Sequence, residues 1–166
     1  MLEKKKEKYI YSLKFKDIFT ELAEDMECKV SERAENIGLN YSTYTSIVNF
    51  GKIPKPKILI RISDHFMISL ENLLGRSTKI PYDGTVQRTN FNDRLEILKK
   101  KHSLTDYKIA RKLHIETNYL TNWRQNNYIP SFDYLITLTD IFKVTLDYLL
   151  GISDDDSNFE PSDDWE

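Results

Sequence analysis

Residues 144–151 read VTLDYLLG and match residues 68–75, which read ISLENLLG, at an offset of 76 positions. Extending that offset back without a gap aligns residues 15–75 with residues 91–151, and 15 of the 61 positions are identical. Other aligned pairs, such as Ile37/Leu113 and Ile47/Trp123, keep their apolar character. The chain therefore contains an internal repeat, and each unit has the length of a small helical domain.

Helical periodicity is clearest in the second unit. Phe91, Leu95 and Leu98 recur at spacings of four and three, the pattern of an amphipathic helix, which ends near His102. Cap and turn signals divide the rest into four further helices. Thr105 begins a helix that buries Ile109, Ala110 and Leu113, and Glu116 or Thr117 begins one that buries Leu120 and Trp123. Pro130 precedes a helix with Leu135 and Leu138, and Thr145 begins the last helix, Leu146 to Leu150, which Gly151 ends. No stretch favours a strand. We expect an all-α fold of two tandem five-helix units.

The repeat divides the chain into five segments. We expect a Lys-rich leader over 1–14, a divergent and acidic first unit over 15–75, and a linker over 76–90 that contains Pro81 and Asp83-Gly84. The basic second unit covers 91–153. Residues 154–166 form an acidic tail, which a run of like charge with Ser and Pro predicts to be disordered.

Charge is distributed unevenly along the chain. The formal net charge is −2, but the tail carries −7 and residues 1–153 carry +5. Residues 15–51 of the first unit carry −4, whereas the equivalent residues 91–127 of the second unit carry +4. Because neutralisation of phosphates supplies much of the affinity for nucleic acid, the second unit is the better candidate for DNA binding.

Several classes of function are excluded by residue types and spacings. The single cysteine, Cys28, cannot form an internal disulfide, and three scattered histidines with one thiol do not make a metal site. Five glycines form no phosphate-binding loop, and no histidine is spaced to act with a nucleophile. We expect no enzyme activity, no catalytic residue and no metal or cofactor. The absence of a long apolar run or signal peptide predicts a cytoplasmic protein without membrane contact.

Residues 106–113 and 117–125 form two short helices joined by a tight turn, which is the helix-turn-helix arrangement. With Leu120 and Trp123 buried, the face of the latter helix that is left for a ligand consists of side chains that donate and accept hydrogen bonds: Thr117, Asn118, Thr121, Asn122 and Gln125. Such side chains can pair with base edges in the major groove of DNA.

The stretch LTDYKIARKLHI (104–115), followed by YLTNW (119–123), Ile129-Pro130-Ser131 and DYLLG (147–151), resembles the phage repressor and Cro-like (XRE-type) helix-turn-helix family. The resemblance spans residues 91–153, and residues 15–75 are similar more distantly. It implies sequence-specific binding of double-stranded DNA in transcriptional control, with the third helix of a unit reading bases. The implied base-reading residues are Thr117, Asn118, Thr121 and Asn122 in the second unit and Tyr41, Ser42, Thr45 and Ser46 in the first. Candidates for contact with the DNA backbone are Lys99, Lys100, Lys108, Gln125, Asn127, Tyr128, Lys52 and Lys55.

Two residues depart from the family pattern. Asp106 places an acid where the family approaches phosphates, and Arg33 replaces the core residue Ile109 of the second unit. The latter predicts a locally altered helix or a side chain that extends to solvent.

The leading hypothesis is a transcriptional regulator, expected to be a repressor, in which the fused units imitate a repressor dimer. The alternative is a protein interaction module in which the first unit or the acidic tail binds a partner or a second copy of the chain, and only the second unit, or neither, binds DNA. In a variant of the alternative, the tail with Phe159 and Trp165 occupies the basic surface of the second unit and suppresses DNA binding. RNA is a weaker option, because no stacking platform of aromatics is evident.

Overall fold

The structure is a computed structural model that describes residues 10–162, and within this range the chain folds into ten α-helices and one 3₁₀ helix. The prediction of an all-α fold is confirmed. Pairing of extended backbone within this range is limited to an isolated antiparallel bridge between Tyr11 and Lys52. Most of the predicted leader lies outside the described residues, as does Trp165 of the tail. Within 10–162 no helix combines the length and the apolar character that crossing a membrane requires.

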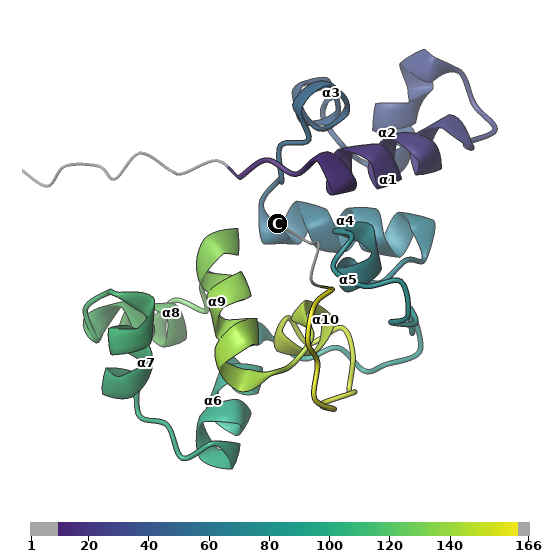
Figure 1. Ribbon diagram of the computed structural model, residues 1–166. Coiled ribbons are helices and arrows are strands. Elements are labelled where there is room, and N and C mark those ends of the chain that lie inside the picture. The colour runs from purple at the N-terminus through teal and green to yellow at the C-terminus, as the bar shows by residue number, and fades with distance from the viewer. Residues whose placement is uncertain (1–9, 163–166) are drawn as a thin grey trace, which may run out of the picture.

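The helices form two sets that meet at α5 and α10 (Figure 1). The first set contains α1 (Leu13–Glu24), η1 (Val30–Glu32), α2 (Arg33–Ile37), α3 (Tyr41–Phe50), α4 (Pro56–Phe66) and α5 (Leu70–Leu73). The second set contains α6 (Phe91–Lys101), α7 (Asp106–Leu113), α8 (Asn118–Gln125), α9 (Phe132–Phe142) and α10 (Leu146–Leu149). The bounds of α4 and α9, and of α5 and α10, lie 76 positions apart, which is the offset of the sequence repeat.

The two sets differ most at α2. Where the second set has the single helix α7, the first set has η1 followed by α2. Arg33 lies at this break, half-buried, and its guanidinium donates to the backbone carbonyl of Glu24 at 3.5 Å. A charged side chain at a core position therefore splits the helix and is directed to its edge.

Aromatic side chains fix α3 and α8 against their neighbours. In the first set the ring of Phe19 lies 5.8 Å from that of Tyr44. In the second set Trp123 lies 6.1 Å from Phe91 and 5.9 Å from Tyr134. These contacts bury one side of α3 and of α8 and leave the opposite side exposed.

The sets are joined by a contact that we call the joint, made of α5, α10 and Arg76. Leu70, Leu73, Leu146 and Leu149 are fully buried there, so the apolar cores of the two sets form one continuous cluster. The carboxylate of Asp147 accepts hydrogen bonds from the backbone N–H groups of Leu70 at 2.7 Å and Glu71 at 3.2 Å. The carboxylate of Glu71 accepts one from the backbone N–H of Leu146 at 2.5 Å. Each helix thus supplies a carboxylate that accepts from free N–H groups at the start of the other, beside the N-caps Ser69 and Thr145.

The segment between the sets is attached to the first set. The side chain of Ser69 donates to the carbonyl of Ile80 at 2.8 Å, and the hydroxyl of Tyr82 donates to Asp64 at 3.1 Å. Arg88 donates to the same carboxylate at 3.0 Å. At its end, the backbone N–H of Thr89 donates to the carbonyl of Gly151 at 3.1 Å, which attaches it to the second set.

The acidic tail differs from the expected disorder over its described part, residues 154–162. Ion pairs connect Asp154 to Arg94 at 2.5 Å, Asp156 to Lys101 at 2.7 Å and Glu160 to Lys143 at 3.2 Å. Phe159 is buried, and the backbone N–H of Ser162 donates to the carbonyl of Arg76 at 2.9 Å. Basic side chains of the second set neutralise the like charges that, together with Ser and Pro, lead the sequence to predict disorder.

Candidate nucleic-acid interface

The α7–α8 pair is built as the sequence predicts. Thr105 caps α7, where its hydroxyl accepts from the backbone N–H of Lys108 at 3.3 Å, and Ile109, Ala110 and Leu113 face inward. The helix ends at His114, whose left-handed backbone (φ 55°) turns the chain sharply toward α8. Leu120 and Trp123 then hold α8 against the rest of the set. The turn therefore presents α8 with one side covered and the other free.

We define the α8 face as the five polar residues opposite Leu120 and Trp123. Thr117, Asn118, Asn122 and Gln125 are exposed, and Thr121 is half-buried. These positions follow the helical repeat, so their side chains share one side of α8. The structure brings all five together, as the sequence analysis expects, and α8 carries no acidic residue.

One hydrogen bond orients a member of this face. The side-chain amide of Asn126 donates to the side-chain oxygen of Asn122 and, at 3.1 Å, to the backbone carbonyl of Asn122. This contact holds the side-chain oxygen of Asn122 and leaves its NH₂ group to donate to a ligand. Beyond α8, the side chain of Asn92 donates to Asn127 and to the carbonyl of Tyr128, each at 3.4 Å, while Tyr128 stays exposed.

Lys99 lies away from solvent and contacts acids, in contrast to the role in phosphate contact that the sequence suggests. Its ammonium lies 2.5 Å from Asp106 and 2.8 Å from Glu96, and the side chain is only 12% exposed. Arg124 completes the group, 2.7 Å from Asp106 and 3.3 Å from Glu96. We call these four residues the charge cluster. It ties α6, α7 and α8 together.

The charge cluster explains how an acid is accommodated at Asp106. Burial raises the pKa of Asp106, but hydrogen bonds and charge from Lys99 and Arg124 outweigh burial, so its pKa lies below the ordinary value. Burial likewise lowers the pKa of Lys99, and the two acids more than offset this and raise it. The carboxylate is therefore ionised and neutralised within the protein before any phosphate approaches.

Basic residues of α7 and α6 remain on the surface around α8. Lys100 and Lys108 are exposed, as expected for contacts to phosphate. Arg111 and Lys112, which the sequence analysis did not select, are exposed on α7 as well. The guanidinium of Arg111 lies over the exposed ring of Tyr107 at 5.9 Å. In the sequence, Arg111 and Lys112 follow Tyr107 and Lys108 by one helical turn, and this spacing predicts that they share the exposed side of α7 with Lys108.

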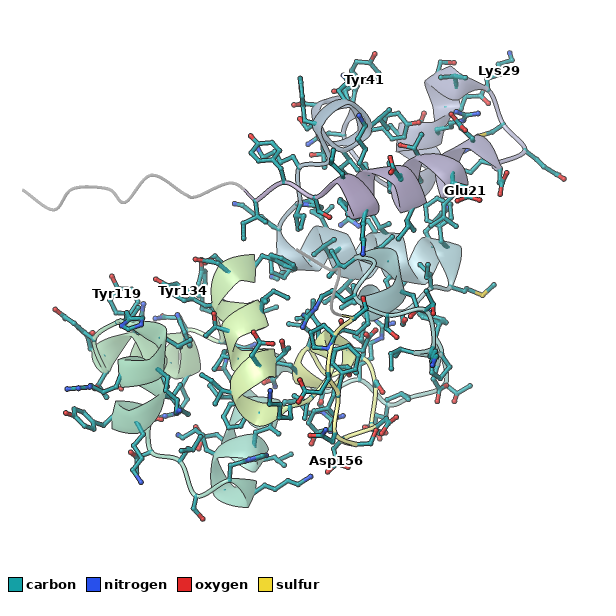
Figure 2. The ribbon with its side chains drawn as sticks, viewed as in Figure 1. Glu21, Lys29, Tyr41, Tyr119, Tyr134 and Asp156 are labelled. Carbon is teal, nitrogen blue, oxygen red and sulfur yellow. The ribbon has the colours of Figure 1, made fainter. Side chains whose placement is uncertain are left out.

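The first set presents a different face on α3. Asn40 caps this helix, accepting from the backbone N–H of Thr43 at 2.7 Å. Tyr41 is 73% exposed and projects outward (Figure 2), and Ser42 is exposed. Thr45 and Ser46 are half-buried, and the hydroxyl of Thr45 contacts the carbonyls of Tyr41 at 3.0 Å and Ser42 at 3.2 Å. The structure brings the four together on α3, but without the amide groups that characterise the α8 face.

Charge in the first set is segregated. All its acidic residues from α1 to α2 are exposed: Asp17, Glu21, Glu24, Asp25, Glu27, Glu32 and Glu35. Lys29 lies among these acids, whereas Lys52 and Lys55 lie between the end of α3 and the start of α4. There Lys55 is exposed, Lys52 is half-buried, and Lys16 donates to the carbonyl of Asn49 at 3.1 Å. A local basic surface therefore lies beside α3, formed by lysines that mostly fall outside the range 15–51 whose net charge is −4.

The described part of the tail contacts the second set outside the α8 face. Its three ion pairs engage Arg94 and Lys101 of α6 and Lys143 after α9. Residues 154–162 thus occupy basic side chains of the second set, but none of these side chains belongs to the α8 face. Trp165 lies outside the described residues.

Comparison with curated proteins yields two helix-turn-helix relatives. The chain is 34% identical over 62 residues to the uncharacterized HTH-type transcriptional regulator YobD of Bacillus subtilis (strain 168), a match that covers 37% of this chain and 55% of that protein. It is 36% identical over 58 residues to the HTH-type transcriptional regulator ImmR of the same organism, which covers 35% of this chain and 46% of that protein.

The chain therefore spans about half the length of these curated relatives, and each matched stretch is about as long as one repeated unit. No family profile and no solved structure matches the chain. Both relatives are HTH-type transcriptional regulators, and this chain is similar to them over stretches of 62 and 58 residues.

Proposed function

We propose that this protein is a sequence-specific DNA-binding transcriptional regulator in which two helix-turn-helix units, residues 15–75 and 91–153, act as a covalent pseudo-dimer. The observation that carries the proposal is the α8 face, where amide and hydroxyl side chains lie exposed on a short helix after a tight turn. Amide side chains can form paired hydrogen bonds with adenine in the major groove. Asn118 and Asn122 are the principal readers, with Thr117 and Thr121 beside them.

Backbone contacts surround that face. Lys100, Lys108, Gln125, Asn127 and Tyr128 are exposed donors, and the structure adds Arg111 and Lys112. Lys99 is assigned to the charge cluster instead, because its side chain is enclosed and paired with two acids. Each exposed lysine that meets a phosphate releases counterions, so affinity will fall as salt rises.

The joint supports the pseudo-dimer. Residues at equivalent positions of the two units, Glu71 and Asp147, contact each other's helices reciprocally. A contact in which the same patch meets itself is the signature of two-fold related subunits. Two units held in this way read half-sites separated by about one helical turn, roughly 34 Å. Because the two reading helices differ, the site they select is not a palindrome.

The first unit contributes mainly backbone contacts. Lys52 and Lys55 lie beside α3, where they meet phosphates, and Tyr41, Ser42, Thr45 and Ser46 are its base-reading candidates. The side chain of Thr45 already contacts its own helix, which reduces the hydrogen bonds that it can offer to bases. The resemblance to phage repressors leads us to propose repression as the regulatory outcome.

The test is selection of DNA from a random library by the intact chain and by an Asn118→Ala/Asn122→Ala variant. The wild type should enrich one motif, and the variant should lose enrichment at the base positions read by α8 while keeping salt-dependent, non-specific binding. Equal enrichment of the same motif by both proteins contradicts the assignment of α8 as the reader.

A second candidate function rests on the seven exposed acids that lie between the start of α1 and the end of α2, which suit a basic protein partner. In that case the first unit holds a partner while the second alone meets DNA. A Lys52→Ala/Lys55→Ala variant distinguishes this partner role from DNA binding by the first unit. Unchanged affinity for the selected DNA site favours the partner role for the first unit, and a loss of affinity favours the pseudo-dimer.

A further inference from the structure

Arg76 is fully buried at the joint although it carries a charge. It directly follows Gly75 at the end of α5, and only 1% of it is exposed. Its Nε lies 3.4 Å from the carboxylate of Glu71. Burial of an arginine is unfavourable unless its donors are satisfied. The buried position of Arg76 therefore depends on the groups that accept hydrogen bonds from its guanidinium.

Those partners come from the second set as well as the first. The two terminal guanidinium nitrogens donate to the hydroxyl of Thr139 at 3.4 and 3.3 Å, and one of them lies 3.8 Å from Asp140. Both residues belong to α9. Arg76 therefore spans the joint, fixed to its own unit by Glu71 and to the other unit by α9.

The equivalent position in the second unit shows that the local backbone does not require a charge. That position is Ile152, a buried apolar residue. The backbone N–H of Ile152 donates to the carbonyl of Asp147 at 2.9 Å, and that of Arg76 donates to the carbonyl of Glu71 at 2.9 Å. The same backbone hydrogen bond ends both helices, so the arginine side chain is not needed to end α5 and has another role.

The tail covers this arginine. The ring of Phe159 lies 5.7 Å from the guanidinium carbon, and the ring is almost completely buried. The backbone N–H of Phe159 donates to the carbonyl of Lys143 at 2.9 Å, which anchors it to the second set. Three residues on, Ser162 donates to the carbonyl of Arg76 through both its backbone N–H, at 2.9 Å, and its hydroxyl, at 3.3 Å. The described part of the tail thus begins on the second set and contacts the first set at Ser162.

These contacts are compatible with one relative orientation of the two sets. A rotation about α5 and α10 removes Thr139 and Asp140 from the guanidinium and exposes Phe159 to water. The first change removes the contacts that this buried charge makes with α9, and the second exposes apolar surface. Apolar contacts between the leucines are not directional. The orientation is therefore set by the polar contacts of the joint, those of Arg76 together with those that Glu71 and Asp147 make with the helix ends.

We propose that Arg76, covered by Phe159 and Ser162, is the spacing-determining residue of this protein: it locks the orientation of the two units and so sets the separation of half-sites that the intact chain accepts. The part of this inference that concerns half-sites rests on the proposed function. The lock itself is a property of the free protein and is tested without DNA.

The lock is measured by the distance between spin labels on the intact chain. Glu21 and Ile97 are exposed, occupy equivalent positions of α1 and α6, and lie outside the joint and the proposed DNA surfaces, so each is changed to Cys after Cys28→Ser. The background protein should give one narrow distance distribution. Phe159→Ala should broaden it or add a second distance. Arg76→Met with Glu71→Gln should do the same without leaving an unpaired buried carboxylate.

Asp156→Asn is the matched control, since Asp156 belongs to the tail but pairs only with Lys101 of the same set. It should leave the distribution unchanged. A narrow, unshifted distribution in both the Phe159→Ala and the Arg76→Met/Glu71→Gln proteins overturns the lock.

The consequence for DNA is measured with duplexes in which the two selected half-sites are moved apart one base pair at a time. The wild type should prefer one spacing by about tenfold or more, because a rigid link raises the effective concentration of the second unit only at the matching distance. Phe159→Ala should lose that preference and keep its affinity for the isolated half-site of the second unit. A retained preference overturns the inference. Failure of every duplex to bind argues against the proposed function, and the label distances still decide the lock.

Discussion

Glu71 and Asp147 lie 76 positions apart in the chain, and each carboxylate caps the helix that carries the other. Asp147 accepts from the backbone of Leu70 and Glu71, and Glu71 accepts from the backbone of Leu146. Both side chains are buried, and the guanidinium of Arg76 lies beside Glu71. Two carboxylates therefore share one buried cation at the contact that joins the two sets of helices.

This arrangement predicts that stability falls as pH rises from about 4 to about 7, the range between the unfolded and folded pKa values of the two groups. Burial raises the pKa of Glu71 to about 7 and that of Asp147 to about 6, against the lowering effects of Arg76 and of the backbone donors. Because the folded protein binds these protons more tightly than the unfolded chain does, each group destabilises the fold progressively between its unfolded and its folded pKa, by up to about 1.4 kcal/mol per pH unit. Urea unfolding at intervals from pH 5 to pH 8 measures the slope.

Glu71→Gln is the control for that titration. The amide oxygen still accepts from Leu146, but the side chain does not ionise, so the decrease in stability should shrink and move to the lower range set by Asp147. A variant with the same pH dependence as the wild type would show that Glu71 does not titrate at the joint.

The amides of the α8 face should determine specificity. Asn118→Ala or Asn122→Ala should each cost about 1–3 kcal/mol on the selected site and relax the preference at one base position. Asn158→Ala, an exposed amide of the tail, should have no effect. Fluorescence anisotropy with single-base variants of the site measures both quantities. Equal losses on every sequence would mean that these amides touch phosphates and not bases.

Lys108 and Lys99 should differ in how they affect DNA binding. Lys108 is exposed, so Lys108→Ala should weaken binding to all sequences and reduce the slope of log affinity against log salt by about one. Lys99 is paired with Glu96 and Asp106, so Lys99→Met should lower the free energy of unfolding with a smaller change in the salt slope. The prediction fails if the two variants change the salt slope equally.

The charge cluster should couple α7 to α8. In a double-mutant cycle of Asp106→Asn and Arg124→Gln, we expect a coupling energy of at most about 1 kcal/mol, because the Arg124 side chain is 45% exposed and solvent screens the pair. Unfolding at low and high salt supplies the test, since the coupling should decrease as salt rises. A coupling of zero at low salt would show that α8 is positioned by Leu120 and Trp123 alone.

The helices and the faces of α3 and α8 could be predicted from sequence because they depend on local patterns. Thr105 and Asn90 act as caps, His114 and Asn127 adopt left-handed backbone, and Trp123 is buried, all from short-range signals. The repeat strengthened the prediction, because the apolar positions of each helix in one unit had to match those of the equivalent helix in the other unit.

Contacts between distant charged residues could not be predicted in this way. In the sequence, Glu71 and Asp147 look like ordinary acids in the first turn of a helix, where acidic side chains commonly remain exposed. Lys99 looks the same as Lys100 in a run of three lysines, and only its place on α6 puts it beside Asp106. The sequence predicts that the tail acids are solvated, because their basic partners Arg94, Lys101 and Lys143 each lie more than 15 positions away along the chain.

The central claim, that one chain acts as a dimer on DNA, is tested most directly by a hydroxyl-radical footprint of the intact protein on its selected site, together with the mass of the complex. We predict one chain per site and two protected patches on the same side of the duplex, about one helical turn apart and unequal in base preference. A single protected patch, or two chains bound to a symmetric site, would contradict the account.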